Sequence, residues 1–174
     1  MTATVNPLLE VRDLVRDYVL PRRRLLAPLP RLRALDGVSF RIEAGRSFGI
    51  VGESGCGKST LARTILGLER PTGGSVRLRG QEIFAVSAGE LRTLRRHMQI
   101  IFQDPYGSLD PRQRVGRIVA EPLTMTEAGR TRAARRMRVA EALAAVGLAA
   151  EAARKYPHEF SGGQRQRIAI TRAL

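Results

Sequence analysis

Alternating apolar and polar residues in the first half of the chain predict β-strands. Leu8 to Tyr18 has β-type residues with mixed alternation, and Ala34 to Ile42 contains the turn signal Asp36-Gly37 before it alternates. Ser75 to Arg79 alternates again. The apolar run Phe48 to Val51 is too short for a helix and predicts a buried strand. The first half is therefore expected to be rich in strands.

Helical patterns dominate the second half. Ser87-Ala88-Gly89-Glu90 has the S-x-x-E form of a capping box and predicts the start of a short helix. The apolar run Met98 to Phe102 predicts one more buried strand. Val115 to Leu123 and Arg132 to Val146 then predict helices, the second with an apolar face and with Gly147 as its C-terminal cap.

Length and composition indicate one soluble globular domain. The chain has 174 residues, of which 43% are hydrophobic and 26% charged. No apolar stretch approaches the roughly 18 residues that span a bilayer, and Glu10, Arg12 and Asp13 stand where a signal peptide would be apolar. A cytosolic location is the expectation. One cysteine and two histidines exclude an internal disulfide and argue against a dedicated zinc site.

The net charge of +14 raises the question of a nucleic-acid partner. The charge is mostly arginine, scattered over predicted helix faces and not gathered in a stripe with aromatic residues. We therefore interpret these arginines as solvated surface residues and not as a nucleic-acid-binding surface. A third interpretation is that the basic residues face the acidic inner surface of a membrane. The one dense basic cluster, Arg22-Arg23-Arg24 with Arg31 and Arg33, lies in a proline-rich stretch that predicts an exposed loop.

The nine residues from Gly52 to Thr60 carry the strongest chemical pattern. They satisfy the spacing G-x-x-x-x-G-K-[S/T] between an apolar run and a helical pattern, which is the context of a phosphate-binding P-loop. Backbone N–H groups and the positive end of the helix dipole would surround a polyphosphate. Lys58 would reach the outer phosphates, and the Ser59 hydroxyl would coordinate Mg²⁺. Cys56 is either a reactive thiol near a helix N-terminus or a small side chain at a variable loop position.

Three features outside the P-loop are ambiguous when each is considered alone. Ser161-Gly162-Gly163-Gln164 precedes the helical pattern Arg165 to Leu174, so it is either an anion-binding helix N-terminus or an ordinary S-x-x-Q capping box. Gln103 is either a ligand for metal or water, or a surface residue at a strand exit. Tyr18 either stacks on an adenine ring or packs on the core at the end of its strand.

Together these residues resemble the nucleotide-binding subunit of ABC transporters. Gly52 to Thr60 matches the Walker A motif, Gln103 stands where the Q-loop glutamine is expected, and Ser161 to Gln164 matches the family signature. The order and approximate spacing agree as well. The sequences of Gln103 to Arg112 and of Tyr156 to Ser161 are similar to those of the oligopeptide and dipeptide importer branch. The resemblance covers essentially the whole chain.

The resemblance implies an α/β fold with a P-loop NTPase (RecA-like) core, an antiparallel β subdomain and an inserted helical subdomain. The strand-rich part with the P-loop would occupy about residues 1–88, the helical insertion with the Q-loop 89–160, and the signature motif with its helix 161–174. Lys58 and Gln103 would be catalytic, and Ser59 and Gln103 would bind Mg²⁺. The ATP-binding set would be Tyr18, Gly52, Ser54, Gly55, Cys56, Gly57, Lys58, Ser59, Thr60, Ser161, Gly162, Gly163 and Gln164.

The resemblance also implies a function and partners. The chain would belong to the ATP-binding, energy-coupling subunit of an importer for oligopeptides or dipeptides, at the cytoplasmic face of the inner membrane. Two such subunits would dimerise head to tail, contact membrane permease subunits, and depend indirectly on an extracytoplasmic solute-binding protein. Two alternatives stay open: a soluble ABC ATPase that acts on nucleic acid or the ribosome, and a remnant without catalysis.

The family resemblance also implies residues beyond the last position of this chain. In the family, the signature helix leads to the Walker B aspartate, the catalytic glutamate, the D-loop and a switch histidine, whereas this sequence stops at Leu174. Neither His97 nor His158 can replace the switch histidine, because both precede the signature helix. We therefore expect an N-terminal portion of a longer ATPase that binds ATP and hydrolyses it negligibly alone.

Overall fold

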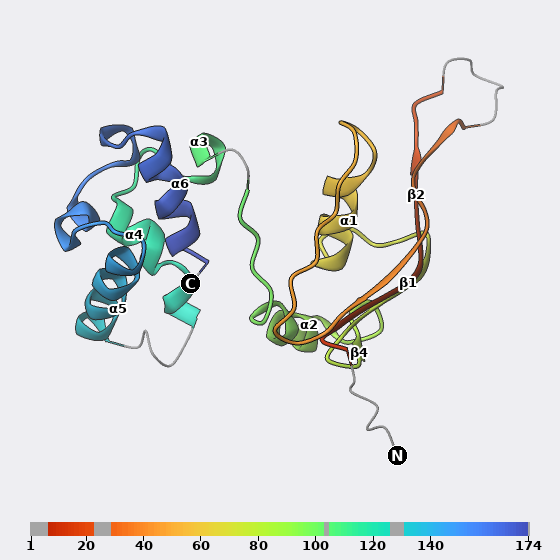
Figure 1. Ribbon diagram of the computed structural model, residues 1–174, viewed down its shortest axis with the longest axis horizontal. Coiled ribbons are helices and arrows are strands. Elements are labelled where there is room, and N and C mark those ends of the chain that lie inside the picture. The colour runs from red at the N-terminus through yellow and green to blue at the C-terminus, as the bar shows by residue number, and fades with distance from the viewer. Residues whose placement is uncertain (1–6, 23–28, 103–104, 126–130, 174) are drawn as a thin grey trace. The chain divides into compact units, whose positions relative to one another are not determined.

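The computed structural model describes residues 7–22, 29–102, 105–125 and 131–173 (Figure 1). These residues fold into two compact units, Met1–Met98 and Gln99–Leu174, and each unit is described by itself. Gln103 and part of the predicted basic cluster, Arg23 and Arg24, lie outside the described residues.

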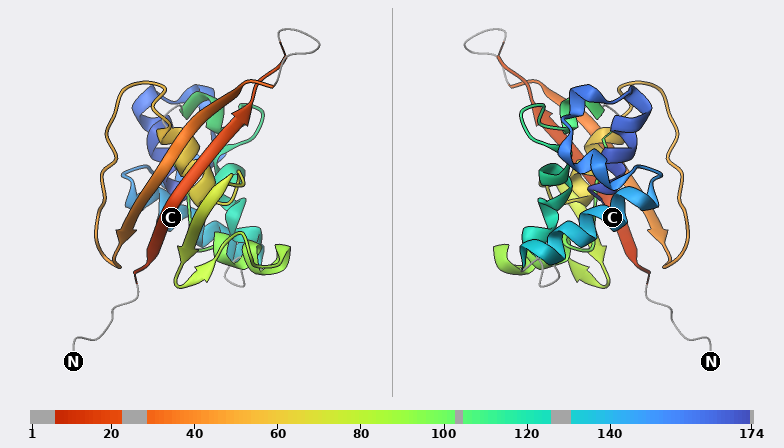
Figure 2. Two further views of the ribbon diagram at one scale, coloured as in Figure 1. Left: turned by 90° about the vertical axis from the view of Figure 1, so that its right-hand side faces the viewer. Right: turned by 90° about the vertical axis from the view of Figure 1, so that its left-hand side faces the viewer.

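The first unit is built on a four-stranded antiparallel sheet. Its strands are β1 (Leu9–Val19), β2 (Arg31–Ile42), β3 (Gly73–Leu78) and β4 (Gln81–Glu82), in the order β2-β1-β3-β4. Figure 2 shows β1 between β2 and β3. The strands predicted from the alternating segments are thus confirmed. Where the loop between β1 and β2 begins and ends, the Leu20 amide donates to the Pro30 carbonyl over 2.8 Å.

The Asp36-Gly37 pair does not form the predicted turn. Leu35 pairs with Arg16 and Val38 with Leu14, so two residues of β2 face one residue of β1. Gly37 has φ +66°, the left-handed conformation that this bulge requires. Because pairing with β1 resumes on the other side, the pair bends a continuous strand and does not end it.

Two helices pack against one apolar cluster of the first unit. They are α1 (Lys58–Ile65), which buries Leu61 and Thr64, and α2 (Ala88–Arg95), which buries Leu94. The capping box predicted at Ser87 is present in full. Besides the helix residues Leu61 and Leu94, the buried cluster consists of Val11, Leu14, Leu35, Val76, Leu78 and Ile83. The sheet therefore holds the P-loop helix through its inner face.

The two predicted buried strands, Phe48 to Val51 and Met98 to Phe102, are not formed. Both segments are irregular, and Val51 is 94% exposed. A buried parallel strand depends on hydrogen-bonded neighbours and on covered faces. Within the described part of the chain, neither segment has a strand beside it. Both segments are apolar, but an apolar segment without neighbouring strands does not form a strand. Phe48 instead stacks on Phe40 with 4.8 Å between ring centroids.

The second unit is helical. Its α-helices are α3 (Pro105–Ser108), α4 (Val115–Ala120), α5 (Arg132–Ala145) and α6 (Gly162–Thr171), and its 3₁₀ turns are η1 (Pro122–Met125), η3 (Ala150–Arg154) and η4 (Pro157–Glu159). The core contains Leu109, Val115, Ile118, Val119, Val139, Leu143, Leu148, Ala152, Phe160, Ile168 and Ala169. Across the described ranges, no helix is both long and apolar enough to traverse a bilayer.

Close backbone approach joins α4 to η3. A Cβ on Gly116 would lie 2.8 Å from the Ala153 carbonyl oxygen, so only glycine fits there without a shift. The Val115 amide also donates to the Lys155 carbonyl over 2.9 Å. At the end of α5, Gly147 has φ +70° and confirms the predicted C-terminal cap. The contacts of Val115 and Gly116 hold α4 against η3 and the residue that follows it.

Candidate nucleotide-binding site

The P-loop connects the irregular segment before it to α1. Gly55 and Gly57 have φ +84° and +99°, in the left-handed region that favours glycine. Gly57 is the N-cap of α1, and a Cβ there would lie 2.4 Å from the Ala34 carbonyl oxygen on β2. Glycine at this position therefore allows both the turn into the helix and the close contact with the sheet.

The N-terminus of α1 is open to an anion. The N-cap Gly57 offers no side-chain hydrogen bond, and the first turn holds no acidic residue. The first N–H groups of a helix lack partners inside the helix and carry the positive end of its dipole. A phosphate group beside Lys58 would meet both. The local backbone is therefore suited to the ligand predicted from the sequence.

Lys58 turns back onto its own loop. Its Nζ donates to the carbonyl oxygens of Gly52 over 2.7 Å and Glu53 over 2.6 Å, and lies 3.4 Å from the Cys56 Sγ. A Cβ on Gly52 would lie 2.6 Å from the same sulfur, so Gly52 leaves room for the Cys56 side chain. The positive charge is thus held at the loop by main-chain oxygens.

The hydroxyl residues after Lys58 differ in their surroundings. The Ser59 side chain is exposed, whereas the Thr60 Oγ1 lies 3.4 Å from the Tyr18 hydroxyl. Deeper in α1, the buried Thr64 hydroxyl donates to the Thr60 carbonyl over 2.8 Å. Mg²⁺ keeps several waters and takes few protein ligands when it travels with phosphates. The exposed Ser59 fits that role, and the described residues hold no cluster of three or more potential metal-ligating His, Cys, Asp or Glu side chains.

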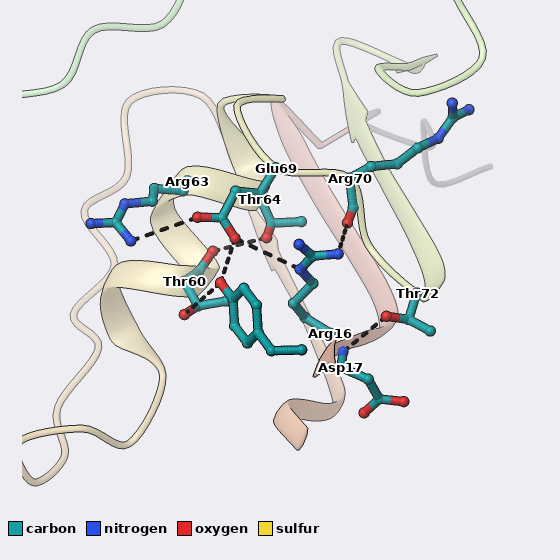
Figure 3. A network of polar contacts seen from close by, with 9 residues as sticks. Arg16, Asp17, Thr60, Arg63, Thr64, Glu69, Arg70 and Thr72 are labelled. Carbon is teal, nitrogen blue, oxygen red and sulfur yellow. Dashed lines mark hydrogen bonds and ion pairs between the residues drawn. The ribbon is translucent and has the colours of Figure 1, made fainter. Parts of the chain in front are cut away.

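A polar network joins β1, α1 and the loop after α1 (Figure 3), and its contacts hold Tyr18. Its hydroxyl donates to the Glu69 carboxylate, and the Arg16 guanidinium lies 4.7 Å from its ring centroid. Glu69 also pairs with Arg16 Nε at 3.7 Å and with Arg63 Nη1 at 3.6 Å. Arg16 Nη1 donates to the Arg70 carbonyl over 2.8 Å. The network anchors Tyr18 beside Thr60.

Sequence reasoning missed Glu69 and its two arginines. Tyr18 and Glu69 are 51 residues apart, and no spacing rule connects a strand-end tyrosine to a loop glutamate. A weak signal existed in the opposite charges of Arg63, in the last turn of α1, and Glu69, shortly after the helix. The sequence alone does not show that this turn folds onto β1.

Ser161 to Gln164 begins α6 with a complete capping box. The Ser161 Oγ accepts from the Gln164 amide over 3.3 Å, and the Gln164 Oε1 accepts from the Ser161 amide over 3.0 Å. Gly162 and Gly163 are exposed, and a Cβ on either would meet nothing within 4 Å. Neither needs to be glycine for the packing of this unit. Their missing side chains leave the N-terminus of α6 open from outside.

The predicted site residues divide between the two units. Tyr18 and Gly52 to Thr60 belong to the first unit, and Tyr18 meets the P-loop helix at Thr60. Ser161 to Gln164 belong to the second. Gln103, predicted as a catalytic and Mg²⁺-binding residue, lies outside the described residues.

The family model described as "ABC transporter" matches residues 35–174. The di/tripeptide transport ATP-binding protein DppF of Pseudomonas aeruginosa is 50% identical over 170 residues, which are 98% of this chain and 52% of that protein. The dipeptide transport ATP-binding protein DppF of Escherichia coli is 46% identical over 169 residues, 97% of this chain and 50% of that protein. This chain therefore spans about half the length of the curated relatives it matches.

Solved structures resemble the fold as well. The dimeric post-hydrolysis structure of the ATP-binding cassette MJ0796, bound to ADP and Pi, superposes with a TM-score of 0.80 at 30% identity. The likeness covers 95% of this chain and 68% of that one.

Proposed function

The chain belongs to the ABC transporter family, and from this we propose that it is the nucleotide-binding part of a peptide importer's ATP-binding subunit. The observation that carries the proposal is the P-loop, in which Gly57 caps α1 and leaves its N-terminus open beside Lys58. Relatives named for di/tripeptide and dipeptide transport support the class of solute. The subunit would couple ATP binding and hydrolysis to solute uptake.

Within this proposal, the described residues bind and orient the triphosphate. The backbone N–H groups from Gly55 to Ser59 surround the phosphates, and Lys58 exchanges its contacts with the loop carbonyls for contacts with phosphate oxygens. Ser59 offers its exposed hydroxyl to Mg²⁺. Tyr18, held by Glu69, would lie on the side of the adenine ring. When bound, Mg·ATP supplies the phosphoanhydride whose hydrolysis powers transport.

The signature residues would serve a nucleotide on a second subunit. Gly162 and Gly163 leave the N-terminus of α6 uncovered, and its first turn carries no acidic residue that would repel phosphate. A head-to-tail dimer would bring this helix to the phosphates that the other P-loop holds. The MJ0796 structures are described as dimeric, which supports this arrangement. Permease subunits would then hold the dimer at the cytoplasmic face of the membrane.

The alternative of a nucleic-acid or ribosome-associated ATPase is not favoured. The relatives named above are transport proteins. The arginines that produce the net charge of +14 are spread over both units.

Binding of Mg·ATP to the purified chain tests the proposal. Replacing Lys58 with alanine removes a charge-assisted contact to phosphate, which is worth about 1.5–3 kcal/mol. The Kd for Mg·ATP should therefore rise about ten- to a hundredfold. Isothermal titration calorimetry with Mg·ATP measures this change without depending on turnover.

Lys155→Ala is the matched control, because Lys155 is the other lysine of the chain and its ammonium lies 5.9 Å from the Phe160 ring centroid in the second unit. This control should leave the Kd within about twofold. Equal affinities of the Lys58→Ala and Lys155→Ala chains for Mg·ATP would contradict the proposed site.

A further inference from the structure

The second unit contains a cavity of about 680 Å³ between α4, α5 and η3. Its inner wall is made of small and apolar residues, including Gly116, Val139 and Ala153, where α4 approaches η3 closely. Its volume falls within the range of about 300–1,000 Å³ that is usual for ligand sites. The cavity shares no residue with the P-loop or with Ser161 to Gln164.

Six arginines line this cavity beside a single acidic residue, Glu151. The arginines are Arg114, Arg117, Arg132, Arg135, Arg136 and Arg154. Across residues 7–22, 29–102, 105–125 and 131–173, Arg132, Arg136 and Arg154 form no ion pair with an Asp or Glu side chain. These three arginines therefore carry positive charge that no carboxylate in the described part of the chain pairs with.

The placement of this charge on α5 opposes the local rules of helix stability. Arg132, Arg135 and Arg136 lie in the first five residues of the helix, where the dipole favours acidic side chains, and its first turn contains none. Arg132 and Arg136 also repel each other as an i, i+4 pair. Conflicts of this kind between local stability and sequence are expected at functional sites.

We propose that this cavity binds a phosphate-bearing anion. The guanidinium groups of Arg132 and Arg136 from α5 and of Arg154 from η3 offer planar pairs of donors that match phosphate oxygens. The N-terminus of α5, capped by Thr131, adds the positive end of its dipole. An anion here relieves both the repulsion among arginines and their conflict with the dipole. The ligand is either a soluble phosphate compound or the headgroup of an anionic lipid.

The arginine-rich composition of the chain does not explain the cluster by itself. Arg138 lies on the same helix, is not part of the cavity lining and pairs with Glu141 at 3.2 Å. In the first unit, Arg92 on α2 and Arg96 at the C-cap of α2 are exposed. Such arginines are solvated or paired one by one, whereas the lining gathers six around one hollow. The local geometry, not the count of arginines, supports the site.

Pyrophosphate binding tests the proposal in a chain that carries Lys58→Ala, so that the P-loop contributes little. Isothermal titration calorimetry should detect binding, and the triple substitution Arg132→Gln, Arg136→Gln and Arg154→Gln should raise the Kd about tenfold or more. Higher salt should weaken the binding. A parallel sedimentation assay uses vesicles of phosphatidylglycerol, with phosphatidylcholine vesicles for comparison.

The control removes the same number of charges elsewhere, with Arg92→Gln, Arg96→Gln and Arg138→Gln, and should stay within about twofold. A lysine triple at positions 132, 136 and 154 keeps the charge and the fold but loses the paired donors, and it should bind with intermediate affinity. Pyrophosphate binding identifies a soluble phosphate ligand, and retention on phosphatidylglycerol vesicles alone identifies a lipid headgroup. Absence of both, or equal binding by the cavity and control glutamine triples, overturns the proposal.

Discussion

Replacing Gly57 with alanine should destabilise the first unit more than any other single change in the P-loop. Gly57 has φ +99°, and a left-handed conformation costs an alanine about 1–2 kcal/mol. The added Cβ would also lie 2.4 Å from the Ala34 carbonyl oxygen and 3.3 Å from the Leu35 Cδ2. Leu35 is buried, so relief requires movement of α1 away from β2.

The magnitude follows from these two contributions. Overpacking of this kind costs about 1–3 kcal/mol, which brings the expected loss to about 2–5 kcal/mol when the conformational cost is added. Gly55→Ala is the matched control, since Gly55 has φ +84° but a Cβ there meets nothing within 4 Å. It should cost about 1–2 kcal/mol. The difference between the two variants isolates the contact of the loop with β2.

Urea unfolding followed by circular dichroism measures both losses, with an m-value of about 1–3 kcal/mol/M. Hydrogen exchange of the amides in α1 assigns the change to the first unit. Equal losses in Gly57→Ala and Gly55→Ala would refute the reasoning, because they would mean that the close approach of Gly57 to Ala34 carries no energy.

Two further predictions concern buried or half-buried carboxylates. The Arg12 hydrogen bond, with the charge of Arg41, holds the pKa of Glu10 below its usual range. The resulting stability is therefore present above the unfolded-state pKa and is lost as the pH falls through the folded-state pKa. Between about pH 5 and 3, Glu10→Gln should show a shallower loss of stability than the unaltered chain, and identical slopes would contradict this. Tyr18→Phe and Glu69→Ala each remove the hydrogen bond, and they should be non-additive by about 1 kcal/mol in a double-mutant cycle of unfolding free energies. Additivity of these two changes would show that their hydrogen bond contributes nothing.

Local patterns were predicted well because the residues that decide them are neighbours in the chain. The capping boxes at Ser87 and Ser161 each depend on two side chains three residues apart, and both are formed. The alternation in Leu8 to Tyr18 depends on one buried face of a sheet. The glycine cap at Gly147 is equally local.

Features that depend on distant partners were not predicted. Phe48 to Val51 has the composition of a buried strand, but a strand forms only where another lies beside it, and the described residues provide none. Asp36-Gly37 has the composition of a turn, but the pairing of β1 with β2 on both sides makes it a bulge. The bond between Tyr18 and Glu69 needs the loop after α1 to return to β1. Periodicity along the chain carries no information about such contacts between distant residues.

Gly162 and Gly163 at the start of α6 lower the stability of the helix but leave its N-terminus accessible for the proposed contact with phosphate. Glycine inside a helix costs about 0.5–1 kcal/mol relative to alanine, and at Gly162 and Gly163 nothing in the second unit stands in the way of the extra methyl group. Selection for thermostability alone would therefore drive both positions to alanine. Variants enriched in this way would be more stable, but their added methyl groups would obstruct the N-terminus of α6. The sequences of relatives that assemble are therefore a safer guide for engineering this helix than the melting temperature.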